Sequence, residues 1–546
     1  MTRRSHFSPL RLTDHQGPAW VKWFASLAAV SVVATACGGS SDNDSATEAS
    51  DEPAAVQELV VGSGADPWID SEGDRKRRPN YPLNADVCET LVHLGTDFQL
   101  EPMLASKWEL TGDNTYRFTL KDEVTFSDGR PLTAADVKSA IDYTVKEPAI
   151  GFSFLGAESA TIVDESTVDI TPEKPNLRLV EQINHPTYAV ISPDDDPLND
   201  ANVTCTGPFK VTSYTPEEAL VVERNEDYWG EPAKLDKITF RFFPDDTTRV
   251  LALQNGEVDL INDVPRGVLS NLESQPNTTI ETSPVGSVTL MYVARRDAAG
   301  TPKTLADPLL RRAVAASMDT SAYVEGLLAG NAEEVNTIAP PEILGEFADM
   351  VEGVDFDTEE AARLLDQAGW TRQGDAIRSK DGKPLELTIV FGSPSDLVTA
   401  EFVQAQLREV GIDGKIQQLD AGAYRQALDT GNYDLDISKP NQNDANPAFL
   451  LALRWYSGAT GKNAKIISPG AGTTYDGLID QTLKATDRTE LQRIAAEAMH
   501  ELVDVEVGGI PLSGNYRIFA MNDKVRGVEL HPSGTNQRWS TAFMAK

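Results

Sequence analysis

Alternating apolar and polar residues predict two strands. The segments 115–120 (TYRFTL) and 237–243 (KITFRFF) have this period of two, which is typical of strands with one buried face. Further strand candidates lie at 58–62, 385–391, 415–418 and 434–437. From residue 58 onward, strands and helices alternate to the C-terminus.

Helix signals lie between these strands. Thr133 and Asp357 each precede an acidic residue by three positions, which is the spacing of a capping box. The helix that begins after Asp357 ends at Gly369. A helical stretch also separates the strands 385–391 and 415–418, and this βαβ order predicts a parallel sheet. We therefore expect an α/β fold.

A short apolar run near the N-terminus ends at Cys37. Residues 23–36 follow a basic start and fall short of the roughly 20 residues that a membrane-spanning helix needs. This pattern predicts an export signal over residues 1–36. The segment Ala34-Thr-Ala-Cys37 resembles a bacterial lipobox, in which the cysteine is acylated. Plain secretion with an incidental cysteine is the alternative.

Residues 37–57 contain no aromatic side chain and predict a flexible tether. The whole chain has 546 residues, enough for two or more domains, and a formal net charge of −36. So acidic a surface repels phosphates, which excludes nucleic acid as a partner. Attachment to a membrane would then depend on acyl chains at Cys37.

Two cysteines follow the tether, Cys88 and Cys205. Outside the cell such a pair can form a disulfide, but sequence spacing does not show whether two cysteines are close. A disulfide and two free thiols both stay open.

Motifs for catalysis and metal binding are absent from the sequence. It has no G-x-S-x-G, H-E-x-x-H or C-x-x-C motif and no complete P-loop, and its few histidines lack ligand spacing. We therefore expect no enzyme activity, no cofactor and no metal. An extracellular hydrolase is the least favoured alternative.

The stretch 108–137 carries the most specific pattern. It reads WELTGDNTYRFTL, then VTF at 124–126 and DGRPLTAADV at 128–137. It resembles the signature of the extracellular solute-binding proteins that serve oligopeptide, dipeptide and nickel ABC importers, bacterial solute-binding protein family 5. Further blocks that resemble this family follow at 84–92, 206–210, 224–230, 245–249, 253–259 and 310–314. These blocks identify a scaffold and no substrate.

The resemblance implies a two-lobed periplasmic-binding-protein-like fold (type II, large cluster C), with an extra subdomain in lobe one. Lobe one would comprise residues 58–288 and 511–546, with the subdomain at about 95–200, and lobe two residues 289–510. Two crossover strands, near 288–293 and 509–512, would join the lobes and let them close over a ligand by a hinge motion.

The resemblance also suggests ligand contacts. In peptide-binding relatives, an aspartate in a loop similar to A-D-x-x-x-P holds the peptide's α-ammonium group, and Asp444 in the segment 443–447 (NDANP) is the candidate here. The alternative is that Asp444 and Asn446 cap the helix that begins near Phe449. Other candidates are Asn441, Trp455, Tyr456 and Trp68; for the aromatic residues, core packing is the alternative.

The expected function is capture of short peptides for an ABC importer, by a monomer that is lipid-anchored on the outer face of the cell membrane (the periplasmic side if an outer membrane is present). Its partners would be the solute and the permease subunits. Alternative solutes are a nickel chelate, an opine or an oligosaccharide. A sensor or adhesin that uses the same scaffold is the alternative from another class.

Overall fold

The computed structural model describes residues 52–64 and 86–546, apart from short gaps. The gaps are at residues 113, 147–156, 173–178, 186–187, 195–202, 441, 443–444, 460, 462, 486 and 535–536. The predicted signal peptide with Cys37, most of the tether, and the candidates Trp68, Asn441 and Asp444 lie outside the described residues. Among the described residues, no helix is both long and apolar enough to cross a bilayer.

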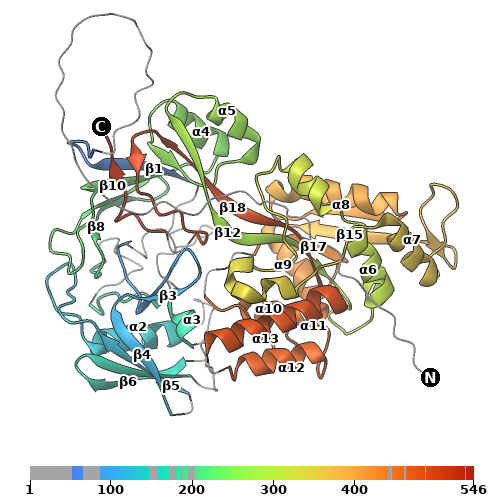
Figure 1. Cartoon of the computed structure of the whole chain (residues 1–546), viewed down its shortest axis with the longest axis horizontal. Coiled ribbons are helices and arrows are strands. Elements are labelled where there is room, and N and C mark those ends of the chain that lie inside the picture. The colour runs from blue at the N-terminus through green and yellow to red at the C-terminus, as the bar shows by residue number, and fades with distance from the viewer. Residues whose placement is uncertain are drawn as a thin grey trace, which may run out of the picture. The chain divides into compact units, whose positions relative to one another are not determined.

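A ten-stranded mixed sheet forms the centre of the described chain (Figure 1). Its strands, in spatial order, are β16 (Asp413–Gln418), β15 (Glu386–Phe391), β17 (Leu435–Ser438), β12 (Thr278–Val293), β18 (Gly509–Asn522), β11 (Leu260–Ile261), β1 (Glu58–Ser63), β10 (Lys237–Phe242), β9 (Ala219–Arg224) and β8 (Phe209–Thr215).

The two longest strands, β12 and β18, pair antiparallel in the middle of this sheet (Figure 1). Their register runs from Thr278 opposite Asn522 to Tyr292 opposite Gly509, with irregularities between residues 282 and 290. These strands contain the segments 288–293 and 509–512, in which the resemblance places the crossovers. The lobe boundaries themselves stay a prediction.

The structure confirms the predicted βαβ unit. β15 and β16 pair in parallel, and α8 (Leu397–Glu409) connects them. One bond of each capping box also forms: the Asp357 side chain accepts a hydrogen bond from the Glu360 amide at 2.9 Å at the start of α7 (Thr358–Gln367). At the start of α2 (Ala134–Lys146), the Thr133 amide donates to the Asp136 carboxylate at 2.9 Å.

A smaller antiparallel sheet lies within the range predicted for the extra subdomain. Its order is β4 (Ala105–Thr111), β5 (Thr115–Leu120), β7 (Thr167–Pro172) and β6 (Ala157–Asp164), and α2 packs against it. The 128–137 block begins with a tight turn in which Gly129 has a φ of 87°, a conformation that favours glycine. A separate hairpin, β2 (Val92–Leu94) and β3 (Leu100–Pro102), precedes this sheet.

Further helices flank the sheets. They are α3 (Leu179–Ile183), α4 (Asp246–Gln254), α5 (Leu269–Glu273), α6 (Pro308–Ala316), α9 (Ala421–Thr430), α10 (Phe449–Arg454), α11 (Ala464–Ile467), α12 (Thr474–Thr482) and α13 (Arg488–His500). Helix α10 differs from the expected cap. Its N-cap is Ala448, which makes no side-chain cap, and Asn446 instead accepts a hydrogen bond from the Ala448 amide at 2.9 Å.

Two apolar clusters cover opposite faces of β12, because successive side chains of a strand point to opposite sides. Met291 and Val293 pack with β15 and α8 in one of them. Leu290 and Tyr292 belong to the other, which we call the Trp455 cluster. Its members include Leu94, Phe98, Tyr433, Ala448, Trp455, Tyr475, Leu491 and Met499.

Cys88 and Cys205 form a disulfide, with their Cα atoms 4.8 Å apart, in a third apolar cluster. Beside it, the buried Glu89 accepts hydrogen bonds from the Tyr228 hydroxyl at 2.7 Å and the Trp229 indole at 3.2 Å. Two of the family-like blocks, 84–92 and 224–230, therefore meet in space. The contacts between these two blocks stabilise the scaffold.

Candidate ligand-binding site

A cavity of about 460 Å³ opens at the carboxyl ends of β15 and β17. We call it the strand-end crevice. It is lined by Gly392, Ser393, Ser395, Asp396, Ala421, Tyr424, Ile437, Ser438 and Lys439. In α/β sheets, ligands bind outside the carboxyl ends of parallel strands, and ligand pockets have volumes of about 300–1,000 Å³. Both its place and its size therefore suit a small solute.

Local sequence shapes one wall of this crevice. Asp420 caps α9 by accepting a hydrogen bond from the Ala423 amide at 2.9 Å, and the first turn of the helix then carries Tyr424. The Tyr424 ring packs over Gly392, where a Cβ atom would lie 3.1 Å from the ring. A larger residue after β15 would push Tyr424 away, so Gly392 allows this close approach.

The charged groups that line the crevice are paired. The Lys439 ammonium lies 2.7 Å from the Asp396 carboxylate, whose side chain is almost fully buried. The remaining polar lining consists of the hydroxyl groups of Ser393, Ser395, Ser438 and Tyr424. This described lining suits a ligand with hydrogen-bonding groups and little net charge at this point.

A buried carboxyl group lies beneath Tyr424. The Tyr424 hydroxyl donates to Asp436 at 2.7 Å, and Asp436 is only 2% exposed. Burial raises the pKa of Asp436 to about 7, against the opposing effects of the Tyr424 hydrogen bond and the positive charge of Arg454. Tyr292 is the cross-strand neighbour of Asp436, and its buried hydroxyl has no hydrogen-bond partner among the described residues.

This raised pKa predicts a pH-dependent stability. The unfolded chain releases the Asp436 proton near its ordinary pKa of 3.8, whereas the folded chain keeps it to about pH 7. Between these values a rising pH favours unfolding, and Asp436→Asn removes that effect. A shift of one pKa unit corresponds to about 1.4 kcal/mol. We therefore expect the difference in free energy of unfolding, variant minus wild type, to be about 2–4 kcal/mol larger at pH 8 than at pH 4. Urea titrations at both pH values measure this; an equal difference at both would contradict it.

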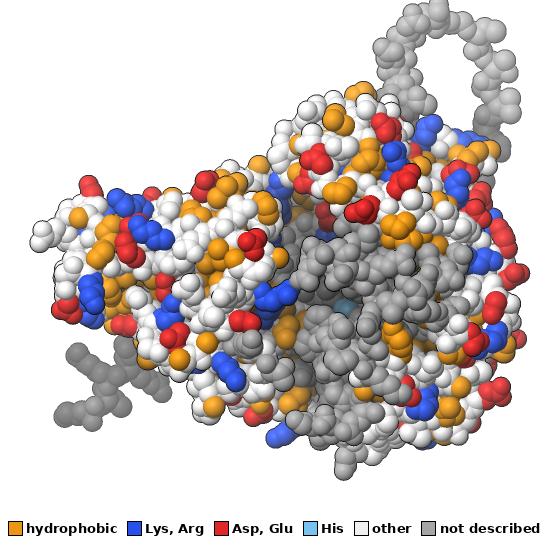
Figure 2. All heavy atoms as spheres, turned by 180° about the vertical axis from the view of Figure 1, so that it is seen from behind, with side chains coloured by type: hydrophobic (Ala, Val, Ile, Leu, Met, Phe, Trp, Pro, Cys, Tyr) orange, Lys and Arg blue, Asp and Glu red, His pale blue; other side chains and the backbone are white. Residues whose placement is uncertain are grey.

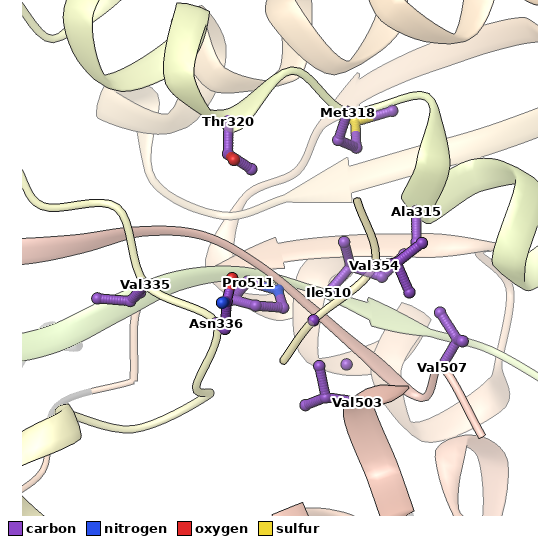
Figure 3. Close-up of a pocket in the computed structure, with 12 residues that line it drawn as sticks. Ala315, Met318, Thr320, Val335, Asn336, Val354, Val503, Val507, Ile510 and Pro511 are labelled. Atoms are coloured by element: carbon purple, nitrogen blue, oxygen red, sulfur yellow. The ribbon is translucent and has the colours of Figure 1, made fainter. Parts of the chain in front are cut away.

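Two further cavities lie elsewhere in the described part of the chain. One, of about 380 Å³, lies between the small sheet and helices α12 and α13, and its walls include Trp108, Tyr116 and Arg488. The other lies at the start of β18 and is lined mainly by apolar side chains such as Met318, Val503 and Val507 (Figure 3). At about 30 Å³ it is too small for a solute.

The structure places two of the candidate contacts. Trp455 is fully buried, stacks on Tyr292 and donates its indole N–H to the Gly508 carbonyl at 3.0 Å, so it packs as a core residue. Tyr456 is half-buried, and its hydroxyl donates to Asp480 at 2.7 Å. The structure does not bring either residue into the strand-end crevice. Trp68, Asn441 and Asp444 lie outside the described residues.

Sequence reasoning missed Asp396, Tyr424 and Lys439, which line the crevice, and Asp436, which lies beneath Tyr424. Their signal was available, because Lys439 directly follows β17 and Asp396 follows β15 by a few residues. The rule that ligands bind at the carboxyl ends of parallel strands would have selected both. As to metals, the described residues contain no group of three His, Cys, Asp or Glu side chains that could hold an ion.

The arrangement of sheets and helices matches solved periplasmic binding proteins. Superposition on NikA from Brucella suis in complex with Fe(III)-EDTA gives a TM-score of 0.78 at 24% identity, over 89% of this chain and 99% of that one. DppA from Helicobacter pylori in complex with the peptide STSA gives a TM-score of 0.70 at 22% identity, over 90% of this chain and 98% of that one. The protein therefore has the fold of a periplasmic binding protein.

Sequence comparison identifies the family. The model of "Bacterial extracellular solute-binding proteins, family 5 Middle" matches residues 99–462, so the chain belongs to this family. The probable D,D-dipeptide-binding periplasmic protein DdpA of Escherichia coli (strain K12) is 26% identical over 87% of this chain and 92% of its own length. The nickel-binding periplasmic protein of the same strain is 26% identical over 78% of this chain and 83% of its own length.

Proposed function

We propose that this protein captures short peptides outside the cell and delivers them to the permease of an ABC importer. The observation that carries the proposal is the strand-end crevice, which has the volume of a ligand pocket and lies where α/β folds bind ligands. Relatives that are named for a dipeptide or bound to a peptide support this ligand class. Relatives named for nickel make a nickel chelate the second candidate.

The lining of the crevice favours a peptide. A peptide backbone is neutral and carries many donors and acceptors, which hydroxyl groups and a paired ammonium and carboxylate can satisfy. An extended peptide in the crevice could form main-chain hydrogen bonds like those of an added strand. Affinity for the backbone would then come from main-chain hydrogen bonds, and selectivity from the side-chain pockets.

The proposed delivery uses the two lobes and the anchor expected from the sequence. Lobe one comprises residues 58–288 and 511–546, and lobe two residues 289–510, with β12 and β18 as the connection between them. The crevice then belongs to lobe two, and lobe one closes over it. An acylated Cys37 keeps this monomer at the outer face of the membrane. In Figure 2, acidic and basic side chains are interspersed over the described part of one face, as on a freely solvated surface.

Identification of the bound ligand tests the function directly. Native mass spectrometry of freshly purified protein should show a complex heavier than the chain. Denaturation should then release a short peptide that can be sequenced. Release of a nickel chelate would select the second candidate, and a bound species that is no small solute would contradict capture for an importer.

A side chain that fills the crevice should block binding. Ala421 lines the crevice at the start of α9, so Ala421→Trp would place an indole in the space for the ligand. We expect affinity for the identified ligand to fall at least about tenfold, which equals about 1.4 kcal/mol. Calorimetric titration measures this.

The matched control for Ala421→Trp is Gln426→Trp, at an exposed position on the same helix that does not line the crevice. It should bind like wild type, and equal affinities for all three proteins would contradict the proposed site. In the same titrations, Asp444→Ala tests the proposed contact to the peptide's ammonium group. This variant should bind a peptide with a free N-terminus more weakly than wild type does, but should bind the same peptide with an acetylated N-terminus equally well.

A further inference from the structure

The tip of the β2–β3 hairpin enters the Trp455 cluster. Phe98, at the tip, is fully buried there although its φ of 58° is unusual for a residue with a side chain. Leu94 enters the same cluster, and its carbonyl lies 2.9 Å from the His531 imidazole. A segment from the N-terminal part of the chain is thereby docked among helices α10 to α13.

The hairpin tip has a defined conformation. The Gly95 amide donates to the Gln99 carbonyl at 2.8 Å, and the Phe98 amide donates to the Gly95 carbonyl at 3.0 Å. The Asp97 side chain accepts a hydrogen bond from the Gln99 amide at 2.9 Å. These bonds close the turn and leave the Phe98 carbonyl to a partner outside it.

That partner is Arg488, the first residue of α13. One nitrogen of its guanidinium donates to the Phe98 carbonyl at 2.8 Å, and the other terminal nitrogen donates to the Ala445 carbonyl at 3.0 Å. Ala445 belongs to the segment that leads from the crevice residue Lys439 to α10. A single side chain thus bridges the hairpin tip and the segment that follows the crevice.

We propose that Arg488 is a positioning residue, which couples docking of the hairpin to the position of residues 445–448, just before α10. Guanidinium is planar, so its two donors have a fixed relative direction, and the position of one carbonyl restricts the other. Other bonds of the described residues also position this segment, among them those from the Gln442 amide to Gly286 at 3.2 Å and from the Ala448 amide to the Asn446 side chain at 2.9 Å. Only the predicted effect of Arg488 on ligand affinity rests on the proposed function; the coupling itself does not.

Hydrogen exchange of the full-length protein tests the coupling without a ligand. Arg488→Ala should speed exchange about tenfold in peptides that cover 95–100 and in those that cover 442–449, because each loses about 1.4 kcal/mol of local protection. Arg488→Lys should have an intermediate effect, since an ammonium lacks the fork that reaches both carbonyls. The control is Arg493→Ala on the same helix, where the half-buried Arg493 pairs with Glu497. It should change neither segment.

A double-mutant cycle separates coupling from simple anchoring. Asp97→Ala loosens the turn of the hairpin without touching the 442–449 segment. If Arg488 couples the hairpin to the 442–449 segment, Asp97→Ala speeds exchange at 442–449 in the wild-type protein. In a protein that already carries Arg488→Ala, adding Asp97→Ala has no such effect. If Asp97→Ala leaves the exchange rate at 442–449 unchanged in both backgrounds, Arg488 only anchors the hairpin and the proposal is overturned.

Binding of trialanine supplies the functional readout. Arg488→Ala should weaken it about tenfold, and Arg493→Ala should leave it unchanged. If wild type binds neither trialanine nor any other small solute, the proposed function fails, while the exchange experiment still decides the coupling. If wild type binds and Arg488→Ala binds equally well, the positioning role fails and the function stands.

Discussion

Joint replacement of Cys88 and Cys205 by alanine should lower the free energy of unfolding by about 3–5 kcal/mol. The disulfide joins residues 117 positions apart, so it removes much of the freedom of the unfolded chain. Both half-cystines are buried in an apolar cluster, where alanine fits without leaving an unpaired polar atom. Urea unfolding followed by circular dichroism measures the difference.

Reduced wild-type protein is the control for the disulfide. If the loss comes from the cross-link, wild type that unfolds in the presence of a phosphine reductant should show nearly the same midpoint as the double variant. A reduced wild type that stays as stable as the oxidised protein would assign the loss to packing at the two alanines. An unchanged midpoint for the double variant would show that the bridge contributes nothing to stability.

Replacement of Trp455 by alanine should cost a similar amount, about 3–5 kcal/mol, because it opens a cavity in a close-packed core. The Trp455 ring stacks on Tyr292 at 4.9 Å between centroids, and it lies so close to β18 that a Cβ atom at Gly509 would be 3.0 Å from it. It also satisfies the Gly508 carbonyl, which would be left without this donor. Chemical unfolding of the variant measures the loss.

The neighbouring Tyr456 is the matched control for Trp455. Its ring is half-buried at the edge of the Trp455 cluster and its hydroxyl donates to the exposed Asp480, so Tyr456→Ala should cost less than Trp455→Ala, about 1–2 kcal/mol. Ligand affinity, measured on the folded protein, should be the same for both variants and wild type. A Trp455→Ala protein of normal stability and reduced affinity would instead make Trp455 a wall of the binding site.

Local sequence patterns predicted the elements best where a single segment determines its own structure. The strand at 385–391 and the helix after Asp357 follow from hydrophobic period and a cap, and both form within a residue or two of the prediction. The family-like blocks gave the fold class for a different reason. Residues such as Glu89 and Tyr228 are far apart in sequence but specify one scaffold contact.

The crevice was harder to predict because its residues come together only through tertiary structure. Tyr424 on α9 reaches Asp436 on β17, and no local period announces that contact. Trp455 is ambiguous for a related reason. An aromatic residue at the end of a helix has the same local sequence whether it faces the core or a cleft, and only the packing of β12 and β18 beside it decides.

The irregular register of β12 and β18 has a mechanical consequence. A regular two-stranded ribbon resists torsion along its whole length, whereas each bulge interrupts the ladder and increases the local twist. The interruptions fall between Thr282 and Leu290, so the ribbon is torsionally softest there. A torque between the two ends of the large sheet is then absorbed over these few residues. The Trp455 cluster resists the same rotation, because Leu94 and Phe98 from one side of this stretch pack there against Trp455 and Leu491 from the other.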